Sequence, residues 1–299
     1  MVGKYGNVYQ PLYIDDRFDY VLFSNDFEET TLGIWQVLPI PVPAEINPKD
    51  KKRLSRYPKT HPEIMLSKYE ASLYIDANVQ IIDKWIYDRF VELVDKKIDY
   101  AGVRLLVTGR DCIYRHAYDM CLLGAENDLN AIVELHELRK EEFPEHFGLN
   151  ENNVIFRRHT KSMQDVNSLW WKWIVDYSFR DQFSYMYCLW KNKILLDYFL
   201  PIGEDSRNST HLRYYSHNEN LYVAKQKWVK KNLLEQLRNK CRLLSRYHKK
   251  YYEWEWMFIC RLPFPKIFLI ISGLIATIIN FPLLVSKLCY NFYVKNNES

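Results

Sequence analysis

The sequence predicts an α/β fold with a central mixed sheet followed by C-terminal helices. Three observations indicate it: a length of 299 residues, a composition of 48% hydrophobic and 26% charged residues, and strand-like runs that alternate with helical periods. A chain of this length can bury a core in one large or two medium domains. The net charge of +4 is too small to indicate a nucleic-acid partner.

Hydrophobic periodicity and turn residues predict the elements in chain order. Strands are expected over residues 18–26, 33–42, 72–76, 101–108 and 153–159. Helices are expected over residues 81–94 and 112–124, and as a pair within residues 166–192. Residues 48–66 are basic and irregular, so a short helix there is expected to be broken by Pro58 and Pro62.

The end of one predicted strand carries two polar side chains. In residues 72–82, SLYIDANVQII, Asp76 and Asn78 interrupt a run of strand-forming residues that resumes at Val79. Both residue types favour turns, which is the simpler interpretation. Their oxygens at this spacing are also suitable ligands for a metal ion that holds a phosphate. The stretch alone leaves both interpretations open.

A basic motif precedes this strand. Arg53, Arg56 and Lys59 recur every third residue, a spacing that can direct all three toward one anion. Guanidinium and ammonium groups in such a cluster suit a diphosphate. A solvated basic turn is the alternative.

Two later motifs also carry chemically active side chains. Arg110 and Asp111 follow a predicted strand, where open α/β sheets bind ligands. Asp181 and Gln182 lie among aromatic residues in SFRDQFSY. There, a surface salt bridge between Arg180 and Asp181 is the alternative to a functional role.

The C-terminal third has a different character. Residues 221–250 contain ten Lys or Arg and one acidic residue, in the pattern of a basic amphipathic helix. Residues 267–285 are 19 residues without a charge, close to the roughly 20 needed to span a bilayer. A shallow or re-entrant membrane helix fits equally, and a buried core helix is the alternative.

The cysteines and the first residues indicate the compartment. Six cysteines show no paired spacing, and the first ten residues lack the apolar core of a secretory signal. Reduced thiols in the cytoplasm and no zinc site are therefore expected. The predicted domains are residues 1–205, 206–255 and 256–299, the last two forming a basic extension and an apolar tail.

Taken in order, the motifs resemble the DUF616 family, a glycosyltransferase-like domain of the TOD1/MUCI70 type, over residues 2–192. Bacterial members of that family look like polysaccharide-cluster glycosyltransferases. The matching stretches are Tyr74–Asn78 with Ala77 in place of Gly, Arg110–Tyr114, Gly148–Asn152 and Ser178–Ser184. Family members have a strand before the turn that residues 2–9 supply here.

The resemblance implies a GT-A-like nucleotide-sugar-binding fold and a role for each motif. Asp76 and Asn78 would hold Mn²⁺ or Mg²⁺ on the donor diphosphate, with His217 or His211 as a further ligand. Asp181 is the candidate catalytic base and Asp111 the candidate partner of the donor sugar. The predicted donor- and phosphate-binding residues are Arg53, Arg56, Lys59, Arg110 and Gln182.

The predicted function is a metal-dependent glycosyltransferase that moves a sugar from a nucleotide-sugar donor to a glycan or lipid-linked acceptor. Surface polysaccharide synthesis at the cytoplasmic face of a membrane, with the C-terminal tail as anchor, is the expected setting. The first alternative is a catalytically inactive nucleotide-sugar-binding protein at a membrane. The second is a nucleotidyl- or phosphotransferase that uses the same metal chemistry.

Overall fold

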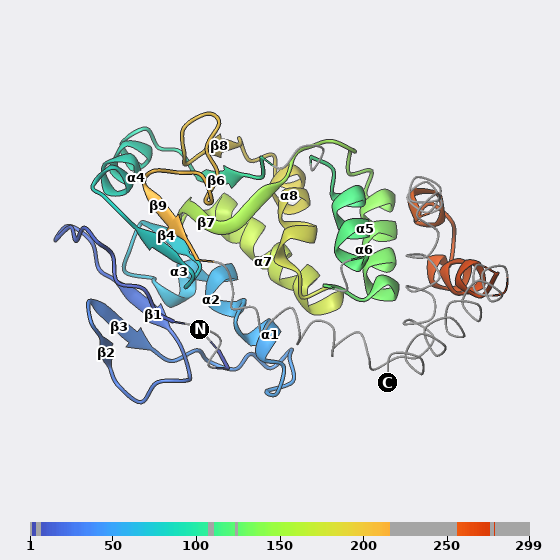
Figure 1. Ribbon diagram of the computed structural model, residues 1–299, viewed down its shortest axis with the longest axis horizontal. Coiled ribbons are helices and arrows are strands. Elements are labelled where there is room, and N and C mark those ends of the chain that lie inside the picture. Colours follow the sequence, from blue (N-terminus) through green and yellow to red (C-terminus); the bar gives the residue numbers. More distant parts are fainter. Residues whose placement is uncertain are drawn as a thin grey trace, which may run out of the picture. The chain divides into compact units, whose positions relative to one another are not determined.

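The computed structural model describes residues 2–3, 7–106, 111–122, 125–215, 256–275 and 278 (Figure 1). The described chain is mixed α/β, as predicted. It forms two compact units, each made of two segments of the chain. The first comprises Met1–Ile113 and Glu145–Asn218, and the second comprises Tyr114–Pro144 and Glu219–Ser299.

The first unit is built on a four-stranded sheet in the order β4-β7-β6-β8. Its strands are β4 (Ala71–Ile75), β6 (Tyr100–Arg104), β7 (Asn150–Arg158) and β8 (Asp197–Tyr198). The central strand β7 is antiparallel to both β4 and β6, whereas β8 is parallel to β6. The sheet is therefore mixed, as the sequence predicts, and three of its strands, β4, β6 and β7, overlap the predicted ranges 72–76, 101–108 and 153–159.

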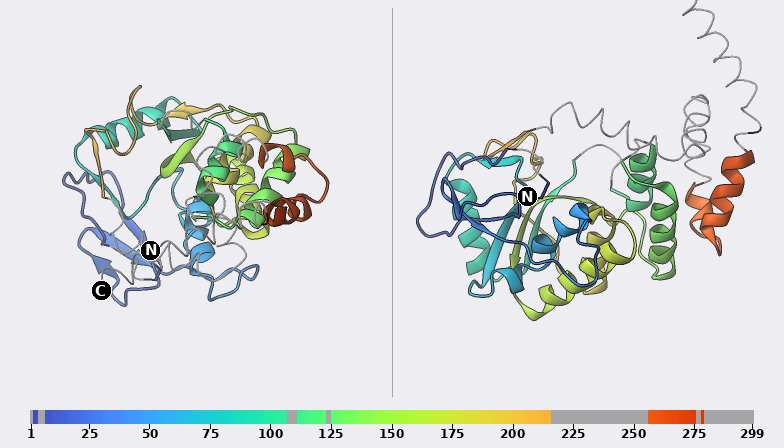
Figure 2. Two further views of the ribbon diagram at one scale, coloured as in Figure 1. Left: turned by 45° about the vertical axis from the view of Figure 1, so that its right-hand side comes forward. Right: turned by 90° about the horizontal axis from the view of Figure 1, so that it is seen from below.

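Alternation along β7 gives the sheet two different faces. Val154 and Phe156 face α4 (Trp85–Asp95), where the rings of Phe90 and Phe156 meet edge to face at 5.1 Å. Arg157 points the other way and donates a 2.9 Å hydrogen bond to Asn167 of α7 (Lys161–Asp176). The helix α8 (Asp181–Lys191) packs beside α7, so the sheet lies between α4 and the α7–α8 pair (Figures 1 and 2).

Two smaller sheets complete the first unit. One has the order β1-β3-β2, from β1 (Val21–Phe23), β2 (Thr31–Leu32) and β3 (Trp35–Leu38). The other pairs β5 (Val79–Ile81) with β9 (Leu212–Tyr214). Because Val79–Ile81 is a strand, the helix predicted from residue 81 begins only at Trp85. The first unit also extends past residue 205, the predicted boundary, to include β9.

The basic segment before β4 folds as three single-turn helices. They are α1 (Lys51–Leu54), α2 (Tyr57–Thr60) and α3 (Pro62–Met65). Pro58 and Pro62 lie in the first turn of α2 and α3, where a missing N–H costs nothing. The prediction that prolines divide this segment is confirmed.

The second unit contains α5 (Ile113–Leu122), α6 (Asp128–Lys140) and a helix that begins near residue 265. The side chains of Tyr118 and Trp256 meet with ring centroids 5.8 Å apart, and His136 Nδ1 lies 3.0 Å from the carbonyl oxygen of Cys260. The helix α6 was not predicted. The buried side of α6 includes Asp128 and Glu134. These two charged residues interrupt the apolar pattern by which a helix is recognised in the sequence.

The described part of the apolar tail is helical and exposes large side chains. Phe264 is 73% exposed and Ile267 is 54% exposed. Within the described ranges, no helix is long and apolar enough to cross a membrane. The predicted basic helix of residues 221–250 and most of residues 276–285 lie outside the described residues.

Candidate functional site

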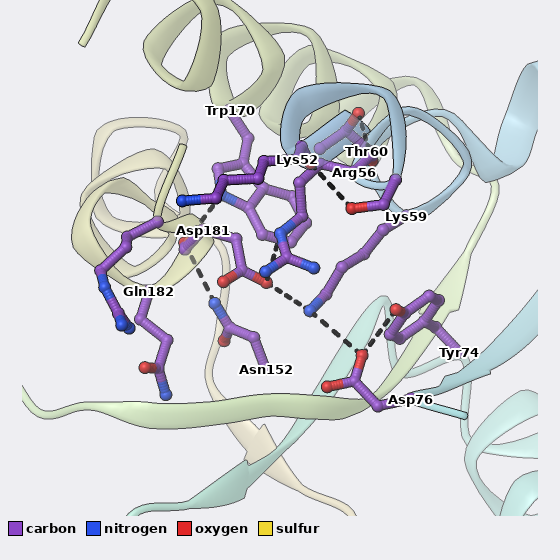
Figure 3. A network of polar contacts seen from close by, with 12 residues as sticks. Lys52, Arg56, Lys59, Thr60, Tyr74, Asp76, Asn152, Trp170, Asp181 and Gln182 are labelled. Carbon is purple, nitrogen blue, oxygen red and sulfur yellow. Dashed lines mark hydrogen bonds and ion pairs between the residues drawn. The ribbon is translucent and has the colours of Figure 1, made fainter. Parts of the chain in front are cut away.

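Asp76 lies directly after β4 and continues its pairing with β7. Its N–H donates to the carbonyl of Asn153 at 2.8 Å. Alternation places the side chains of Tyr74 and Asp76 on the same face of the sheet, while Leu73 and Ile75 pack into the core on the other face. The hydroxyl of Tyr74 donates to Asp76 Oδ1 at 2.6 Å, which fixes the carboxylate (Figure 3).

Asn78 has a local structural role. Its side-chain amide donates to the carbonyl of Tyr215 at 2.9 Å, and its own carbonyl accepts the Tyr215 N–H at 2.8 Å. The N–H of Val79 bonds the carbonyl of Asp76 at 2.9 Å and closes the turn. For Asn78 the turn interpretation therefore has direct support, because the residue joins the β4–β5 turn to the end of β9.

The centre of the site is the buried ammonium of Lys59. Lys59 is 1% exposed and projects from α2 toward two carboxylates (Figure 3). Its Nζ donates a hydrogen bond to Asp181 Oδ2 and lies 3.8 Å from Asp76 Oδ1. It also lies 4.8 Å from the centroid of the Tyr74 ring, a cation–π distance. One lysine thus connects the end of β4 to the start of α8.

Asp181 is the first residue of α8, where the helix dipole favours a negative charge. Its main-chain carbonyl accepts hydrogen bonds from Trp170 Nε1 at 2.9 Å and Asn152 Nδ2 at 3.1 Å. Burial opposes ionisation, but the charges of Arg56 and Lys59 outweigh it and lower the pKa of Asp181 to about 2. Such a carboxylate is a permanent counter-ion and a weak base, because an efficient general base has a pKa near the working pH.

Arg56 lies at this site, whereas Arg53 bonds other partners. Arg56 Nε lies 3.9 Å from Asp181 Oδ2. Arg53 instead donates to the carbonyls of Ile174 at 2.7 Å and Tyr177 at 2.8 Å, at the C-terminal end of α7. A guanidinium at a helix C-terminus satisfies the last carbonyls and complements the dipole. The three-residue spacing therefore brings two of the three basic side chains to one carboxylate.

The remaining predicted residues have other partners. Asp111 is exposed and its Oδ1 lies 2.9 Å from His146 Nδ1. Gln182 donates from Nε2 to the carbonyl of Asn150 at 3.3 Å, next to the start of β7. Arg110 and His217 lie outside the described residues.

His211, the other candidate metal ligand, is held away from Asp76. Its ring stacks on Trp85 at 4.3 Å, and its Nδ1 lies 2.9 Å from Asp83 Oδ2. The β5–β9 register places His211 opposite Ile82, whose N–H donates to the His211 carbonyl at 3.0 Å, at the opposite end of the strand pair from Asn78. Asp83 and Trp85 therefore hold the ring of His211 in place.

The contacts around Asp76 do not suit the predicted divalent metal. Among the residues that the structure describes, no group of three or more His, Cys, Asp or Glu could hold a metal ion. Asp76 Oδ1 already accepts from Tyr74 and faces the ammonium of Lys59. The ammonium alone would repel a divalent ion about 5 Å away by about 7 kcal/mol at an effective dielectric constant of about 20, which opposes the attraction of the Asp76 carboxylate. Mn²⁺ or Mg²⁺ stays a prediction that needs a direct test.

The sequence assigned no role to three residues of the site. Tyr74, Asn152 and Trp170 hold the two carboxylate-bearing residues in place. The signal for Asn152 was available, because NENN at residues 150–153 is a polar run directly before the apolar VIF of a strand. The same run contains Glu151, which is 2% exposed and bonds Ser206 and Arg207.

Comparisons of the chain with models of protein families, with curated proteins and with solved structures gave no match. The fold and the site define an α/β protein in which a buried lysine pairs with two aspartates at the end of the edge strand β4. The resemblance to the DUF616 family stays a prediction.

Acid should weaken the folded state through Asp181. Its pKa is lowered from 3.8 to about 2, so its contribution is fully present above about pH 4 and is lost as the pH falls toward 2. The shift corresponds to about 2 kcal/mol. Urea unfolding between pH 5 and 2.5 should show a steeper loss of stability in the wild type than in Asp181→Asn. Parallel curves for the two proteins would contradict the assigned pKa.

Proposed function

We propose that the protein is a glycosyltransferase that moves a sugar from a nucleotide-sugar donor to a glycan or lipid-linked acceptor. The observation that carries the proposal is the meeting of separately predicted motifs in one charged site. Asp76 from the end of β4, Arg56 and Lys59 from the segment before it, and Asp181 from α8 lie within ion-pair distance of one another in a chain of contacts.

The charge of this site suits a diphosphate. Four cationic side chains, those of Lys52, Arg56, Lys59 and Arg180, lie at or near the two carboxylates. Lys52 lies with its Nζ 4.1 Å from the ring centroid of Phe179, two residues before Asp181. Arg180 is close enough to help lower the pKa of Asp181, after burial and the larger contributions of Arg56 and Lys59. Such cations stabilise charge on a departing diphosphate.

The two carboxylates are assigned different roles in the transfer. The bond from the anomeric carbon to the phosphate oxygen breaks, a bond to the acceptor oxygen forms, and the proton of the acceptor hydroxyl passes to the carboxylate of Asp76. The side chain of Asp76 is 33% exposed and is the carboxylate that substrates can reach. Asp181 is buried and strongly ionised, which suits a partner of Lys59 better than the predicted catalytic base.

A screen of nucleotide sugars tests the function. A true donor should raise the melting temperature by mass action and be consumed in the presence of a glycan or lipid-linked acceptor. Release of a nucleoside diphosphate supports sugar transfer, whereas release of pyrophosphate supports a nucleotidyltransferase. Stabilisation without turnover supports the inactive binding protein. That second candidate is favoured by one observation, which is that Asp76 Oδ1 is already engaged by Tyr74 and Lys59.

We also propose that the C-terminal tail associates with the cytoplasmic face of a membrane. The side chains of Ile267, Ile271 and Leu274 are each about half exposed on the described helix, at 54%, 47% and 48%. Changing all three to Ser should lower binding to vesicles at least about tenfold, because burying apolar surface contributes about 25 cal/mol per Å². Vesicle flotation measures the effect. A wild-type protein that does not float would contradict the proposal.

A further inference from the structure

We infer that the site carries its own fixed cation: the ammonium of Lys59 takes the place at Asp76 that a divalent metal ion would fill, and a nucleoside diphosphate binds without Mn²⁺ or Mg²⁺. The inference rests on the proposed function, because it concerns how that same site holds its donor. It replaces the predicted metal by a residue of the chain.

The first support is the position of the ammonium. Nζ of Lys59 lies 3.8 Å from Asp76 Oδ1, on the same side of the carboxylate as the Tyr74 hydroxyl that also contacts this oxygen (Figure 3). The Lys59 ammonium therefore already supplies positive charge to Asp76, the residue that the resemblance assigns to a metal ion. A second, divalent charge beside it would be repelled.

The second support is that Lys59 cannot leave easily. It is 1% exposed. Its partner Asp181 is held in place because the Asp181 main-chain carbonyl accepts hydrogen bonds from the side chains of Trp170 and Asn152. Removing a buried ammonium from its carboxylate exposes an unpaired charge in a medium of low polarity. A mobile ion would have to displace this anchored one, so the lysine is a permanent part of the site.

The third support is that phosphate charge has other partners nearby. Arg56 is 29% exposed at its side chain and lies 3.9 Å from Asp181, so its guanidinium borders both the buried pair and solvent. Lys52 and Arg180 add positive charge on the same segments, α1 and the start of α8. Arginine binds phosphate oxygens in a bidentate manner without a metal bridge. Lys59 then supplies the fixed positive charge of the site, while the more exposed cations contact the ligand.

Isothermal titration calorimetry of the full chain tests the inference, with uridine, guanosine and thymidine diphosphates as probes. Each is titrated in EDTA and in Mn²⁺. At least one should bind in EDTA, with a Kd that Mn²⁺ changes by less than about threefold.

In Lys59→Met the Kd in EDTA should rise about tenfold or more, and Mn²⁺ should recover part of the lost affinity because Asp76 is then open to a cation. Lys68→Met, which removes an exposed lysine that pairs with Asp19 at 3.7 Å, is the matched control and should bind as the wild type does.

The outcomes separate the two proposals. Wild-type binding only in Mn²⁺ overturns the fixed-cation inference and leaves the proposed function standing. No binding of any nucleoside diphosphate or nucleotide sugar under either condition overturns both. If Lys59→Met raises the Kd of the nucleoside diphosphate equally in EDTA and in Mn²⁺, the lysine has only a structural role, and this result also overturns the inference. If Lys59→Met does not fold, the wild-type comparison decides alone, and Lys59→Arg should bind independently of Mn²⁺.

Discussion

Replacing Asp181 with Asn is expected to lower the free energy of unfolding by about 3–5 kcal/mol, because it leaves a buried ammonium without its counter-ion. Lys59 is 1% exposed and hydrogen-bonds Asp181 directly. The second carboxylate near the Lys59 ammonium, that of Asp76, lies 3.8 Å away and is partly exposed, so it only partly replaces Asp181 as counter-ion. Chemical denaturation with urea at pH 7 measures the loss.

Two further variants make this prediction specific. The pair Lys59→Met with Asp181→Leu should be more stable than Asp181→Asn alone, since removing both charges of a buried ion pair is often nearly neutral. Lys161→Met removes an exposed ion pair with Asp165 and should cost less than about 1 kcal/mol. If Asp181→Asn costs no more than Lys161→Met, the buried pair does not stabilise the fold.

Much of the fold could be predicted because its strands and helices keep simple periods. β4 is a run of strand-forming residues, β7 carries the apolar run VIF within it, and α4 has a clear helical period. The failures have physical causes. The helix α6 buries Asp128 and Glu134, so its buried side does not read as apolar. β5 is three residues long and is defined by its partner β9, which lies more than 130 residues later in the chain.

The site could be predicted only as a set of candidates. Residue type and spacing indicated Asp76, Arg56, Lys59 and Asp181, and the structure brings these four together. Spacing could not show that Arg53 turns to the end of α7, because that contact depends on how two segments 121 residues apart pack. It also could not show that Lys59 is buried, since lysine is almost never buried without a partner. Burial is what changes a predicted phosphate ligand into an internal cation.

Replacing Asp76 with Ala is expected to reduce sugar transfer by about 10²–10⁴, the range for loss of a group that accepts a proton in the transition state. The fold should survive, because Lys59 keeps its hydrogen bond to Asp181 and the Asp76 main chain keeps its bond to Asn153. The side chain is also 33% exposed, so its removal leaves no large cavity. This separates Asp76 from Asp181, whose loss should be felt mainly in stability.

Steady-state kinetics with the donor found in the screen measure this effect, and calorimetry of nucleoside diphosphate binding accompanies them. Turnover should fall while the Kd of the diphosphate changes by less than about fivefold, since a group needed only in the transition state contributes little to ground-state binding. Asp88→Ala is the matched control, because Asp88 is a partly exposed carboxylate of α4 that pairs with Lys84 at 3.3 Å and lies outside the site. It should keep wild-type turnover. If Asp76→Ala also keeps it, Asp76 serves only to close the β4–β5 turn. If diphosphate binding and turnover fall together, Asp76 acts in holding the donor, and the proton must be accepted by another group.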